Sequence, residues 1–467
     1  MKASKTGRGC GKSGMKDKPR VMLAKVKENV KILRRLGSKA RSRASFSMSF
    51  FQTCLIEGGE RGSDSFFGNF TDHNLKPYFI KPFLKLVMET PAESAIAEFN
   101  VVESIRKHVS QLKPIAVKRG LVCVGEYPGK ILLKEGFIEK TSDTLPVLIQ
   151  KASKQTLKTT QSILVTHDTL TLNADADTHF WFNVNNYLAE NEEYLTQLKK
   201  STSELHEAIL LASLWDGLGS AFLPTLFSQF KPPKANSIAI AIMPSKEQPA
   251  DAHFNALASI ALCSSNDSAA VVLLGRDAVE DYLGVDRDGS RMEGNSILNY
   301  LLEAALASDT FIHELSELSR AFSTRFYTAL AITGASFKVY GSFESMLEAA
   351  QLNPFLPFDL TTTQVLFVLV RAPSHLKNKL SRGKIELATA KWTKAITNIK
   401  SVYVSEPIYV NDESDRVDAL VFAGGFNTMD LTVFLQKKAA KVKSEAVKKG
   451  LLKEKEWENI TKSLTAQ

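Results

Sequence analysis

Residues 208–222 of this 467-residue chain read AILLASLWDGLGSAF. The first part, Ala208–Ser213, is a continuous apolar run, which is typical of a parallel strand that is buried on both faces. Gly217 and Gly219 then mark a turn, and helical periodicity begins at Phe222. A strand that leads through a turn into a helix is the repeating unit of an α/β fold, so this stretch decides the fold prediction.

The segments on either side repeat this alternation of strand and helix. Further strands are predicted at Met48–Ile56, Gly120–Val124, Ser162–Val165, Ser237–Met243 and Ala269–Leu274. Helices are predicted at Tyr187–Ser203, Phe222–Phe230 and Asp251–Cys263. The alternation predicts a doubly wound, Rossmann-like α/β domain.

A second unit follows a long helix that is predicted at Ser296–Ser308. Its predicted strands are Gln364–Arg371, Ile399–Val404 and Ala419–Ala423, and its predicted helices are Phe343–Gln351 and Lys384–Asn398. We therefore expect five parts: a basic extension (1–45), the α/β domain (46–295), the central helix and the loop after it (296–322), a smaller α+β domain (323–427) and a lysine-rich C-terminal helix (428–467).

Positive charge is concentrated near the N-terminus. The chain has 59 basic and 50 acidic residues, and residues 1–43 hold 15 of the basic but only 2 of the acidic ones. The rest of the chain is therefore slightly acidic. A basic extension, with an amphipathic helix predicted over 20–36, could bind nucleic acid, anionic lipid or an acidic protein surface. The alternative is a solvated extension that binds nothing.

The composition favours a cytoplasmic protein. No apolar run reaches the roughly 20 residues that span a bilayer, and no N-terminal stretch has the pattern of a signal peptide. Cys10, Cys54, Cys123 and Cys263 are far apart in the sequence, and no pair has metal-ligand spacing. We expect reduced thiols and predict no metal-binding residues.

The glycine turn resembles a motif of the tubulin/FtsZ superfamily. Ser213–Phe222 is similar to the tubulin signature loop, a run of three glycines followed by Thr-Gly-Ser-Gly. Gly217, Gly219 and Ser220 fit this loop. The residues that depart from it are Trp215, Asp216, Leu218 and Ala221.

Later segments resemble the same superfamily in the same order. Ser237–Ser245 is similar to the tubulin strand that ends in Pro-Ser, and His253–Leu257 stands where tubulins have Pro-Tyr-Asn-Ala. Leu298–Leu301 opens the central helix as Leu-Asn-His-Leu does in tubulins. Ala349–Leu360 and the strands Ser401–Val410 and Asp415–Gly425, interpreted as a closing hairpin, look like FtsZ. The resemblance covers about residues 205–427 and indicates a divergent archaeal or bacterial FtsZ-like or tubulin-like protein with a GTPase-type nucleotide domain.

The resemblance implies a site for GTP or GDP, with Mg²⁺ as a further ligand. Glycine-rich loops would hold the phosphates through backbone N–H groups. A first phosphate loop is predicted at Gly58–Ser63, after the first strand. The predicted nucleotide-binding residues are Gly58, Gly59, Gly62, Gly217, Gly219, Ser220, Asn255 and Asn299.

The loop after the central helix carries the predicted catalytic pair. FtsZ has Asn-Leu-Asp-Phe-Ala-Asp at this point, and this chain has Ile312–Glu317, with Glu314 and Glu317 at the same spacing. Two acids three residues apart lie on one face of a helical turn, where they could polarise an attacking water. The alternative is that both are solvent-facing residues of an amphipathic helix whose buried face holds Ile312, Leu315 and Leu318.

Acidic residues stand where the resemblance places the phosphates. Asp216 replaces a glycine of the signature loop, and Thr171–Asp177 would form the third phosphate loop. A carboxylate about 4 Å from a phosphate oxygen is repelled by roughly 4 kcal/mol at an effective dielectric constant near 20. Arg276 stands where a guanine-reading asparagine is expected, and it offers only donors. These departures predict weakened nucleotide binding or none.

Three functions remain open at this point. The first is a cytoskeletal protein that assembles head to tail with itself, or with another tubulin/FtsZ-like protein, and binds GTP weakly. The second is an active polymerising GTPase that uses Glu314 and Glu317, in cell division or cell shape. The third is a nucleic-acid-binding α/β protein that uses the basic extension.

Overall fold

The computed structural model describes residues 91–111, 118–133, 144–151, 168–172, 177–230, 235–266, 270–396 and 398–465. Several predictions lie outside these residues: the basic extension with its helix over 20–36, the strands Met48–Ile56 and Ser162–Val165, the loop with Gly58, Gly59 and Gly62, and most of the third loop. Among the helices that are described, none combines the length and the hydropathy needed to cross a membrane.

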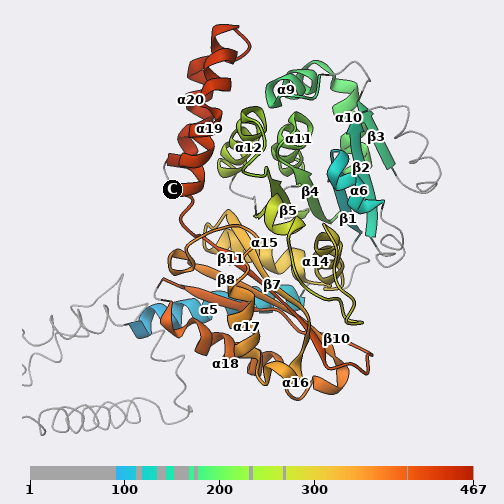
Figure 1. The fold of residues 1–467 in the computed structure, drawn as a ribbon, viewed down its shortest axis with the longest axis vertical. Helices are drawn as coiled ribbons and strands as arrows, with labels where there is room; N and C mark the ends of the chain where they lie inside the picture. The colour runs from blue at the N-terminus through green and yellow to red at the C-terminus, as the bar shows by residue number, and fades with distance from the viewer. Residues whose placement is uncertain are drawn as a thin grey trace, which may run out of the picture. The chain divides into compact units, whose positions relative to one another are not determined.

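A single mixed sheet runs through the described part of the chain (Figure 1). The strands of its first half are parallel: β1 (Arg119–Val124), β2 (Thr144–Lys151), β3 (Asp168–Leu172), β4 (Glu207–Ser213), β5 (Asn236–Met243) and β6 (Val271–Gly275). Their order across the sheet is β3-β2-β1-β4-β5-β6. This is the order of the doubly wound Rossmann fold, whose winding reverses between β1 and β4. The predicted fold class is confirmed.

Helices cover both faces of this half of the sheet because successive side chains of its strands alternate between two apolar cores. In β4, Ala208 and Leu210 belong to one core, and Ile209 and Leu211 belong to the other. The first core is covered by α9 (Trp181–Glu190), α10 (Glu192–Thr202), α11 (Gly217–Phe227) and α12 (Ala250–Ser264). The second is covered by α5 (Pro91–Gln111), α6 (Glu126–Leu132), α13 (Arg276–Glu280), α14 (Ser296–Leu306) and α15 (Phe311–Ala321).

Strand β7 (Phe326–Ser336) joins the two halves of the sheet, because it pairs with β6 in parallel and with β11 (Arg416–Gly424) in antiparallel orientation. On its other side β11 pairs with β8 (Val365–Pro373), whose outer edge carries β9 (Ser401–Val404) and β10 (Ile408–Val410). The prediction of a closing hairpin is therefore wrong, since β11 lies between β7 and β8. Its nearly continuous burial suits an interior strand, whereas β9 and β10 are short, as edge strands tend to be.

The outer face of the second half carries a smaller helical layer. It consists of α16 (Phe337–Tyr340), α17 (Phe343–Gln351) and α18 (Arg382–Trp392), with 3₁₀ turns at Leu360–Thr362, Ser374–Leu376 and Thr393–Ala395. Phe343 and Met346 of α17 and Ile385 of α18 pack against β8 and β11 in a third apolar core. Helix α17 has the predicted bounds.

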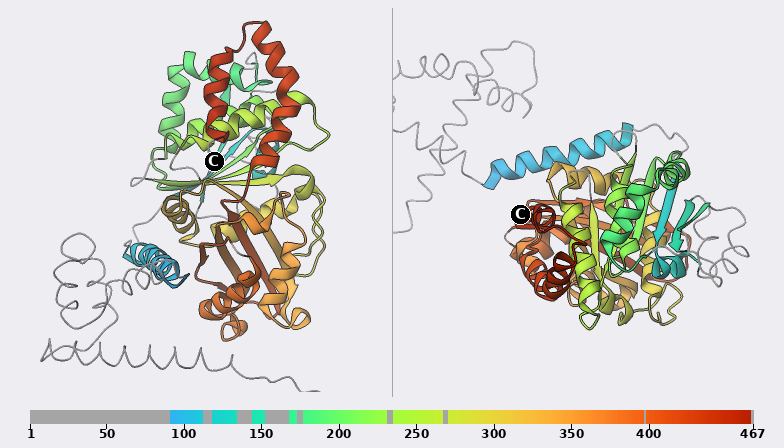
Figure 2. Two further views of the ribbon diagram at one scale, coloured as in Figure 1. Left: turned by 90° about the vertical axis from the view of Figure 1, so that its left-hand side faces the viewer. Right: turned by 90° about the horizontal axis from the view of Figure 1, so that it is seen from above.

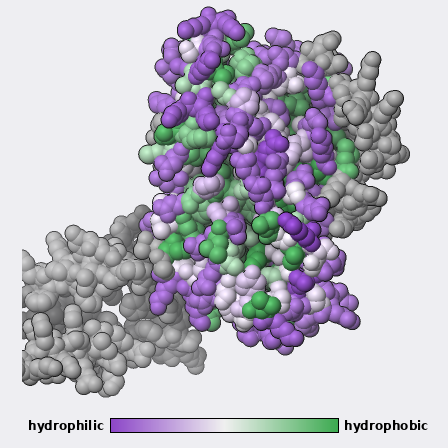
Figure 3. All heavy atoms as spheres, viewed as in Figure 1, coloured by the Kyte–Doolittle hydropathy of each residue, from purple (hydrophilic) through white to green (hydrophobic). Residues whose placement is uncertain are grey.

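The chain ends in two helices instead of the single predicted one. Helix α19 (Met429–Lys448) and helix α20 (Glu454–Thr465) are separated by a turn in which Gly450 has a φ of 69°. Both pack on α12, and the ring of Trp457 stacks on that of Phe254 at 4.6 Å between centroids. The hydrophilic side chains of this helix pair are visible at the top of Figure 3.

Helix α5 lies against α15 (Figure 2). Val102 and Ile105 are buried in the second core. Arg106 donates to Glu386 Oε1 at 2.5 Å and lies 5.4 Å from the centroid of the Tyr403 ring. No helix was predicted here. These contacts fix the segment before β1 to the body of the protein.

Candidate functional site

A pocket of about 450 Å³ opens at the carboxyl ends of the parallel strands. In doubly wound folds, ligands bind at this edge, near the point where the strand order reverses. The pocket is lined by the end of β2, the segment before α9, the turn between β4 and α11, and the start of α12. The lining residues are Lys151, Asp177, Thr178, His179, Trp215, Asp216, Gln248, Pro249, Asp251 and Ala252.

The carboxylate of Asp216 caps the N-terminus of α11. Its Oδ1 accepts the backbone N–H of Gly219 at 2.7 Å, and its Oδ2 accepts the hydroxyl of Ser213 at 2.7 Å. A helix N-terminus carries unsatisfied N–H groups and a partial positive charge, which is the environment that a phosphate uses. In this chain the carboxylate of Asp216 occupies that position at the N-terminus of α11.

Two further polar groups near the start of α11 also have partners within the protein. The N–H of Gly217 donates to the Thr178 carbonyl at 3.0 Å, and the hydroxyl of Ser220 donates to the Asp216 carbonyl at 2.7 Å. A Cβ on Gly219 would lie 1.9 Å from the carbonyl oxygen of Ser213. These glycines are thus required by the close approach of the chain to itself.

The pocket is rich in carboxylates. Burial is the main cause that raises the pKa of Asp216 to about 6, although its hydrogen bonds with Gly219, Ser213 and Leu218 oppose this shift. Asp251 pairs with His179, with 2.5 Å between Oδ2 and Nε2. Asp177 accepts the N–H of His179 at 2.9 Å and the amide of Asn183 at 2.6 Å. An anion would meet three aspartates here, beside the ammonium group of Lys151 and the imidazole of His179.

Aromatic residues and an arginine fill the space beside the turn. The ring of Trp215 packs edge-on against Tyr127, with 5.1 Å between centroids. The guanidinium of Arg276 lies 5.0 Å from the centroid of Trp215 and 5.8 Å from that of Tyr127. This stack joins α6, the β4–α11 turn and α13, so the predicted purine-reading position at Arg276 faces an indole ring.

The loop next to the signature turn starts at Gly125, directly after β1. Gly125 has a φ of 99°, and a Cβ there would lie 3.2 Å from the Ser213 hydroxyl and 3.3 Å from Asp216 Oδ2. A first phosphate loop was predicted at Gly58–Ser63, which lies outside the described residues. The sequence held a signal for Gly125, because this glycine directly follows the predicted strand Gly120–Val124.

Known structures resemble the chain although their sequences barely do. A GTPγS-bound protofilament of CetZ2 from Haloferax volcanii is 19% identical, with a TM-score of 0.54 over 71% of this chain and 99% of that one. CetZ from Methanosaeta thermophila is 14% identical, with a TM-score of 0.55 over 74% and 97%. A GTPγS-form protofilament of TubZ from Bacillus thuringiensis serovar israelensis is 12% identical, with a TM-score of 0.51 over 72% and 93%.

The chain has the tubulin/FtsZ fold. The family resemblance that was inferred from the loops is therefore confirmed at the level of the fold. No protein-family model and no curated protein matches the sequence. The departures in the signature loop therefore belong to a divergent example of this fold.

Two predicted nucleotide-binding asparagines hold segments of the tubulin/FtsZ fold together. Asn255 accepts the N–H of Trp181 at 2.8 Å and donates to the carbonyls of His179 and Trp215 at 2.8 and 3.2 Å. It fixes the two loops that line the pocket. Asn299 donates to the Ile131 carbonyl at 3.0 Å, while its buried Oδ1 has no hydrogen-bond partner among the described residues.

Helix α15 of the tubulin/FtsZ fold carries the predicted catalytic pair. Ile312, Leu315 and Leu318 are buried, as the alternative interpretation expected. Glu314 is buried too, with 6% exposure, so it is not solvent-facing. Its Oε2 accepts the Ser405 hydroxyl at 2.6 Å, and burial raises its pKa.

Glu317 lies at a more accessible position of α15. Its side chain is 21% exposed and accepts from Arg320 at 2.5 Å. The structure therefore places the two glutamates in different environments, one inside the protein against β9 and one near the surface. On the same helix, the Nδ1 atom of His313 lies 2.8 Å from the side-chain amide of Asn236.

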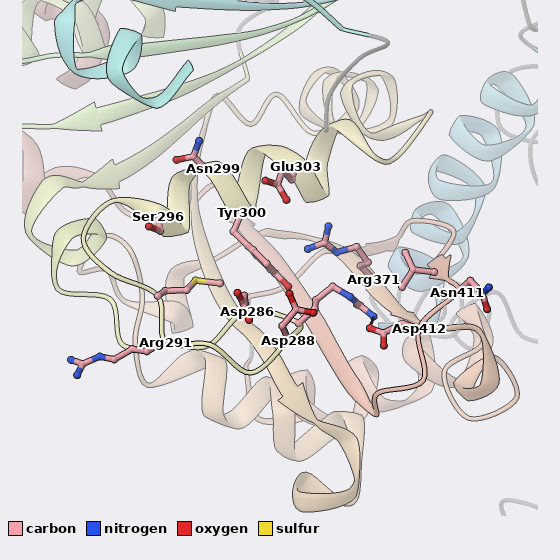
Figure 4. Close-up of a pocket in the computed structure, with 13 residues that line it drawn as sticks. Asp286, Asp288, Arg291, Ser296, Asn299, Tyr300, Glu303, Arg371, Asn411 and Asp412 are labelled. Carbon is pink, nitrogen blue, oxygen red and sulfur yellow. Dashed lines mark hydrogen bonds and ion pairs between the residues drawn. The ribbon is translucent and has the colours of Figure 1, made fainter. Parts of the chain in front are cut away.

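A second pocket of about 510 Å³ lies between α14 and the second half of the sheet (Figure 4). Beneath it, Asp418 is fully buried at a bulge of β11. Its oxygens accept from Tyr300 at 2.9 Å, from Arg371 at 2.8 Å and from the Gly334 N–H at 2.8 Å. Burial opposes the charge of Arg371, but Asp418 outweighs it and raises the pKa of the guanidinium. These residues could not be predicted from the sequence, because isolated charged residues in a strand pattern form no motif.

Proposed function

We propose that this is a tubulin/FtsZ-like cytoskeletal protein that assembles head to tail into filaments and binds GTP weakly or not at all. The observation that carries the proposal is the carboxylate of Asp216 at the N-terminus of α11. It already accepts the Gly219 N–H at 2.7 Å. A phosphate would have to displace it and then face roughly 4 kcal/mol of repulsion at about 4 Å and an effective dielectric constant near 20.

Self-assembly is supported by the neighbours of the fold. Two of the similar structures are protofilaments, that of CetZ2 bound to GTPγS and that of TubZ in its GTPγS form. A head-to-tail interface uses two different surfaces, so it propagates as an open polymer. We propose that this chain makes such contacts with copies of itself or with another protein of the same fold. The basic extension would contact the acidic body of a neighbour or an anionic lipid.

Isothermal titration of the full chain with GTP and with GDP, in Mg²⁺ and again in EDTA, tests the nucleotide part of the proposal. We expect no binding up to millimolar concentration. The matched variants are Asp216→Gly, which frees the Gly219 N–H, and Asp251→Asn, which removes another carboxylate of the pocket but leaves that N–H occupied. We expect Asp216→Gly to gain affinity over both the wild type and Asp251→Asn.

Sedimentation and electron microscopy without nucleotide test the assembly part. We expect filaments from the full chain, and weaker assembly after deletion of residues 1–43. Filaments that form only when GTP is added would contradict a nucleotide-independent polymer. A chain that stays monomeric under all of these conditions, alone and with a second protein of the fold, would contradict the structural role itself.

An active GTPase is the second candidate, and the partial exposure of Glu317 favours it. In that case Glu317 would polarise the attacking water in a neighbouring subunit's site, and Glu314 would lie buried on the same helix. Micromolar, Mg²⁺-dependent binding of GTP by the wild type, with turnover lost in Glu317→Ala, would establish this function and overturn the first proposal.

A further inference from the structure

Three side chains with metal-binding atoms meet where α5 crosses α15. His108 lies in the last turn of α5, and His313 and Glu317 lie one turn apart on α15. One ligand atom from each of the three lies within 4.8 Å of the others. The two imidazole rings are stacked, with 5.6 Å between centroids and 25° between planes. A helical i,i+4 pair with a third ligand from another helix is a common construction for a metal site.

One polar atom in this cluster lacks a partner. His313 is 7% exposed, and its Nε2 is buried without a hydrogen-bond partner among the described residues. Glu317 Oε1 lies 3.7 Å from this nitrogen, which is too far for a hydrogen bond. A buried nitrogen without a hydrogen bond costs about 1–3 kcal/mol unless something satisfies it. His108, by contrast, is exposed, so the cluster is open to solvent on that side.

We propose that His108, His313 and Glu317 bind a Zn²⁺ ion that fastens α5 to α15. Two imidazole nitrogens and one carboxylate oxygen are a typical donor set for zinc with an open fourth position, which water would take here. Ligand atoms around a tetrahedral zinc lie about 3.3 Å apart, given bonds of about 2.0–2.1 Å. The ligand atoms lie up to 4.8 Å apart, so they have to approach one another by about 1–1.5 Å. The exposed side chain of His108 can supply most of this movement.

The surroundings of His313 and Glu317 can adapt to the ion. When Nε2 binds zinc, Nδ1 carries the proton and needs an acceptor. The amide of Asn236, 2.8 Å from Nδ1, supplies one if it turns so that its oxygen faces the ring. That turn gives up the 3.2 Å contact between Arg320 and the amide oxygen. Arg320 still holds Glu317, whose carboxylate has lone pairs enough for both partners.

Zinc at this position would act as a clip on the segment before β1. Helix α5 is otherwise held by Val102, Ile105 and the Arg106–Glu386 pair. The ion would add a cross-link near the C-terminal end of α5. A ligand that binds only the folded state raises stability with its concentration. The melting temperature of the full chain is therefore expected to rise as Zn²⁺ is added.

Titration of the full-length, chelator-treated protein with ZnCl₂ tests the proposal directly. We expect one ion per chain. His108→Ala is the main variant, because the side chain is exposed and its loss leaves the core intact. His375→Ala is the matched control, since His375 is also exposed but lies in the 3₁₀ turn that follows β8. Loss of a direct ligand should weaken binding by more than the about 10–100-fold that follows loss of a second-shell partner.

Two further measurements separate a built site from adventitious binding. Co²⁺ in place of Zn²⁺ should give the intense visible absorption of a tetrahedral site in the wild type and in His375→Ala, and should lose it in His108→Ala. Asn236→Asp supplies a permanent acceptor to Nδ1 and should tighten binding. The proposal is overturned if the wild type binds no Zn²⁺ at 100-fold excess, if His108→Ala binds as tightly as the wild type, or if Co²⁺ shows only weak six-coordinate bands.

Discussion

Two aspartates in different halves of the sheet region, Asp216 and Asp418, both have buried carboxylates but differ in the charge of their hydrogen-bond partners. Asp216 accepts hydrogen bonds from neutral groups, the Ser213 hydroxyl and the backbone N–H groups of Gly219 and Leu218, and its pKa is raised to about 6. Asp418 is paired with Arg371 at 2.8 Å and lies 3.5 Å from Arg287. Neutral hydrogen-bond donors offset little of the free-energy cost of burying a charged carboxylate, whereas guanidinium groups offset much of it. The first site can titrate near neutral pH, and the second is an ion pair that fixes the structure.

The largest effect is expected from Asp418→Ala. Removal of this carboxylate leaves Arg371 buried without its counter-charge, which typically costs about 3–5 kcal/mol. Urea unfolding of the variant and the wild type measures the difference. Asp412→Ala is the control, because Asp412 pairs with Arg287 nearer the surface, where ion pairs contribute about 0–1 kcal/mol. Equal losses in the two variants would show that burial does not distinguish them.

A smaller, pH-dependent effect is expected at Asp216. Its folded pKa of about 6 exceeds the usual 3.8, so the unfolded chain ionises first. Stability is therefore lost as the pH rises from about 4 to 6, by on the order of 3 kcal/mol. Asp216→Asn cannot ionise and should not show this loss. The free energy of unfolding at pH 4 and pH 7 is measured for both proteins. Burial raises the pKa of Glu207 to about 7, so this residue also lowers stability as the pH rises. It does so equally in both proteins, and its effect cancels when the two are compared.

If the wild type and Asp216→Asn instead lose stability in parallel between pH 4 and 7, the neutral partners of Asp216 hold its carboxylate ionised. The contrast with Asp418 would then disappear. The proposed barrier to phosphate binding would remain, because an ionised carboxylate repels a phosphate more strongly than a protonated one does.

The smallest effect is expected from Arg276→Leu. Arg276 and Arg371 each stack on an aromatic ring, at 5.0 Å from Trp215 and 4.7 Å from Tyr300. Arg276 has no buried carboxylate to neutralise, and a partly exposed cation–π contact contributes about 0.5–1 kcal/mol. Arg371→Leu should cost several times more, because it leaves Asp418 unpaired. Urea unfolding of the two variants compares them, and a similar cost for both would mean that the stack dominates over the ion pair.

The strands and helices around the signature turn were largely predictable. Ala208–Ser213 and Ser237–Met243 differ from β4 and β5 by one residue each. Their continuous apolar runs are local signals that survive in the fold. Strand β2 was missed because Thr144–Lys151 contains a proline and polar ends. The predicted single helix at Tyr187–Ser203 is two helices, separated at Asn191.

The candidate site was predictable only in its composition. The sequence placed Asp216 and Trp215 in a loop where the superfamily has glycines, which was enough to predict weakened phosphate binding by this loop. It did not reveal that Asp216 caps the helix or that Arg276 stacks on Trp215, because these depend on where side chains point. The role of Asn255 could likewise not be predicted, since its partners His179 and Trp181 lie just before and at the start of α9, far from it in the sequence.

The sequence by itself determined the alternation of strands and helices, the order of the loops and the acidic character of the turn, because these follow from local apolar pattern and residue type. Only the tertiary structure decided which polar groups are already satisfied and which are not. Gly219 and Asp216 satisfy each other across one turn, whereas His313 Nε2 is left without a partner where α5 crosses α15. Hydrogen bonds and metal sites need atoms within a few ångströms of one another, and chain folding alone sets those distances.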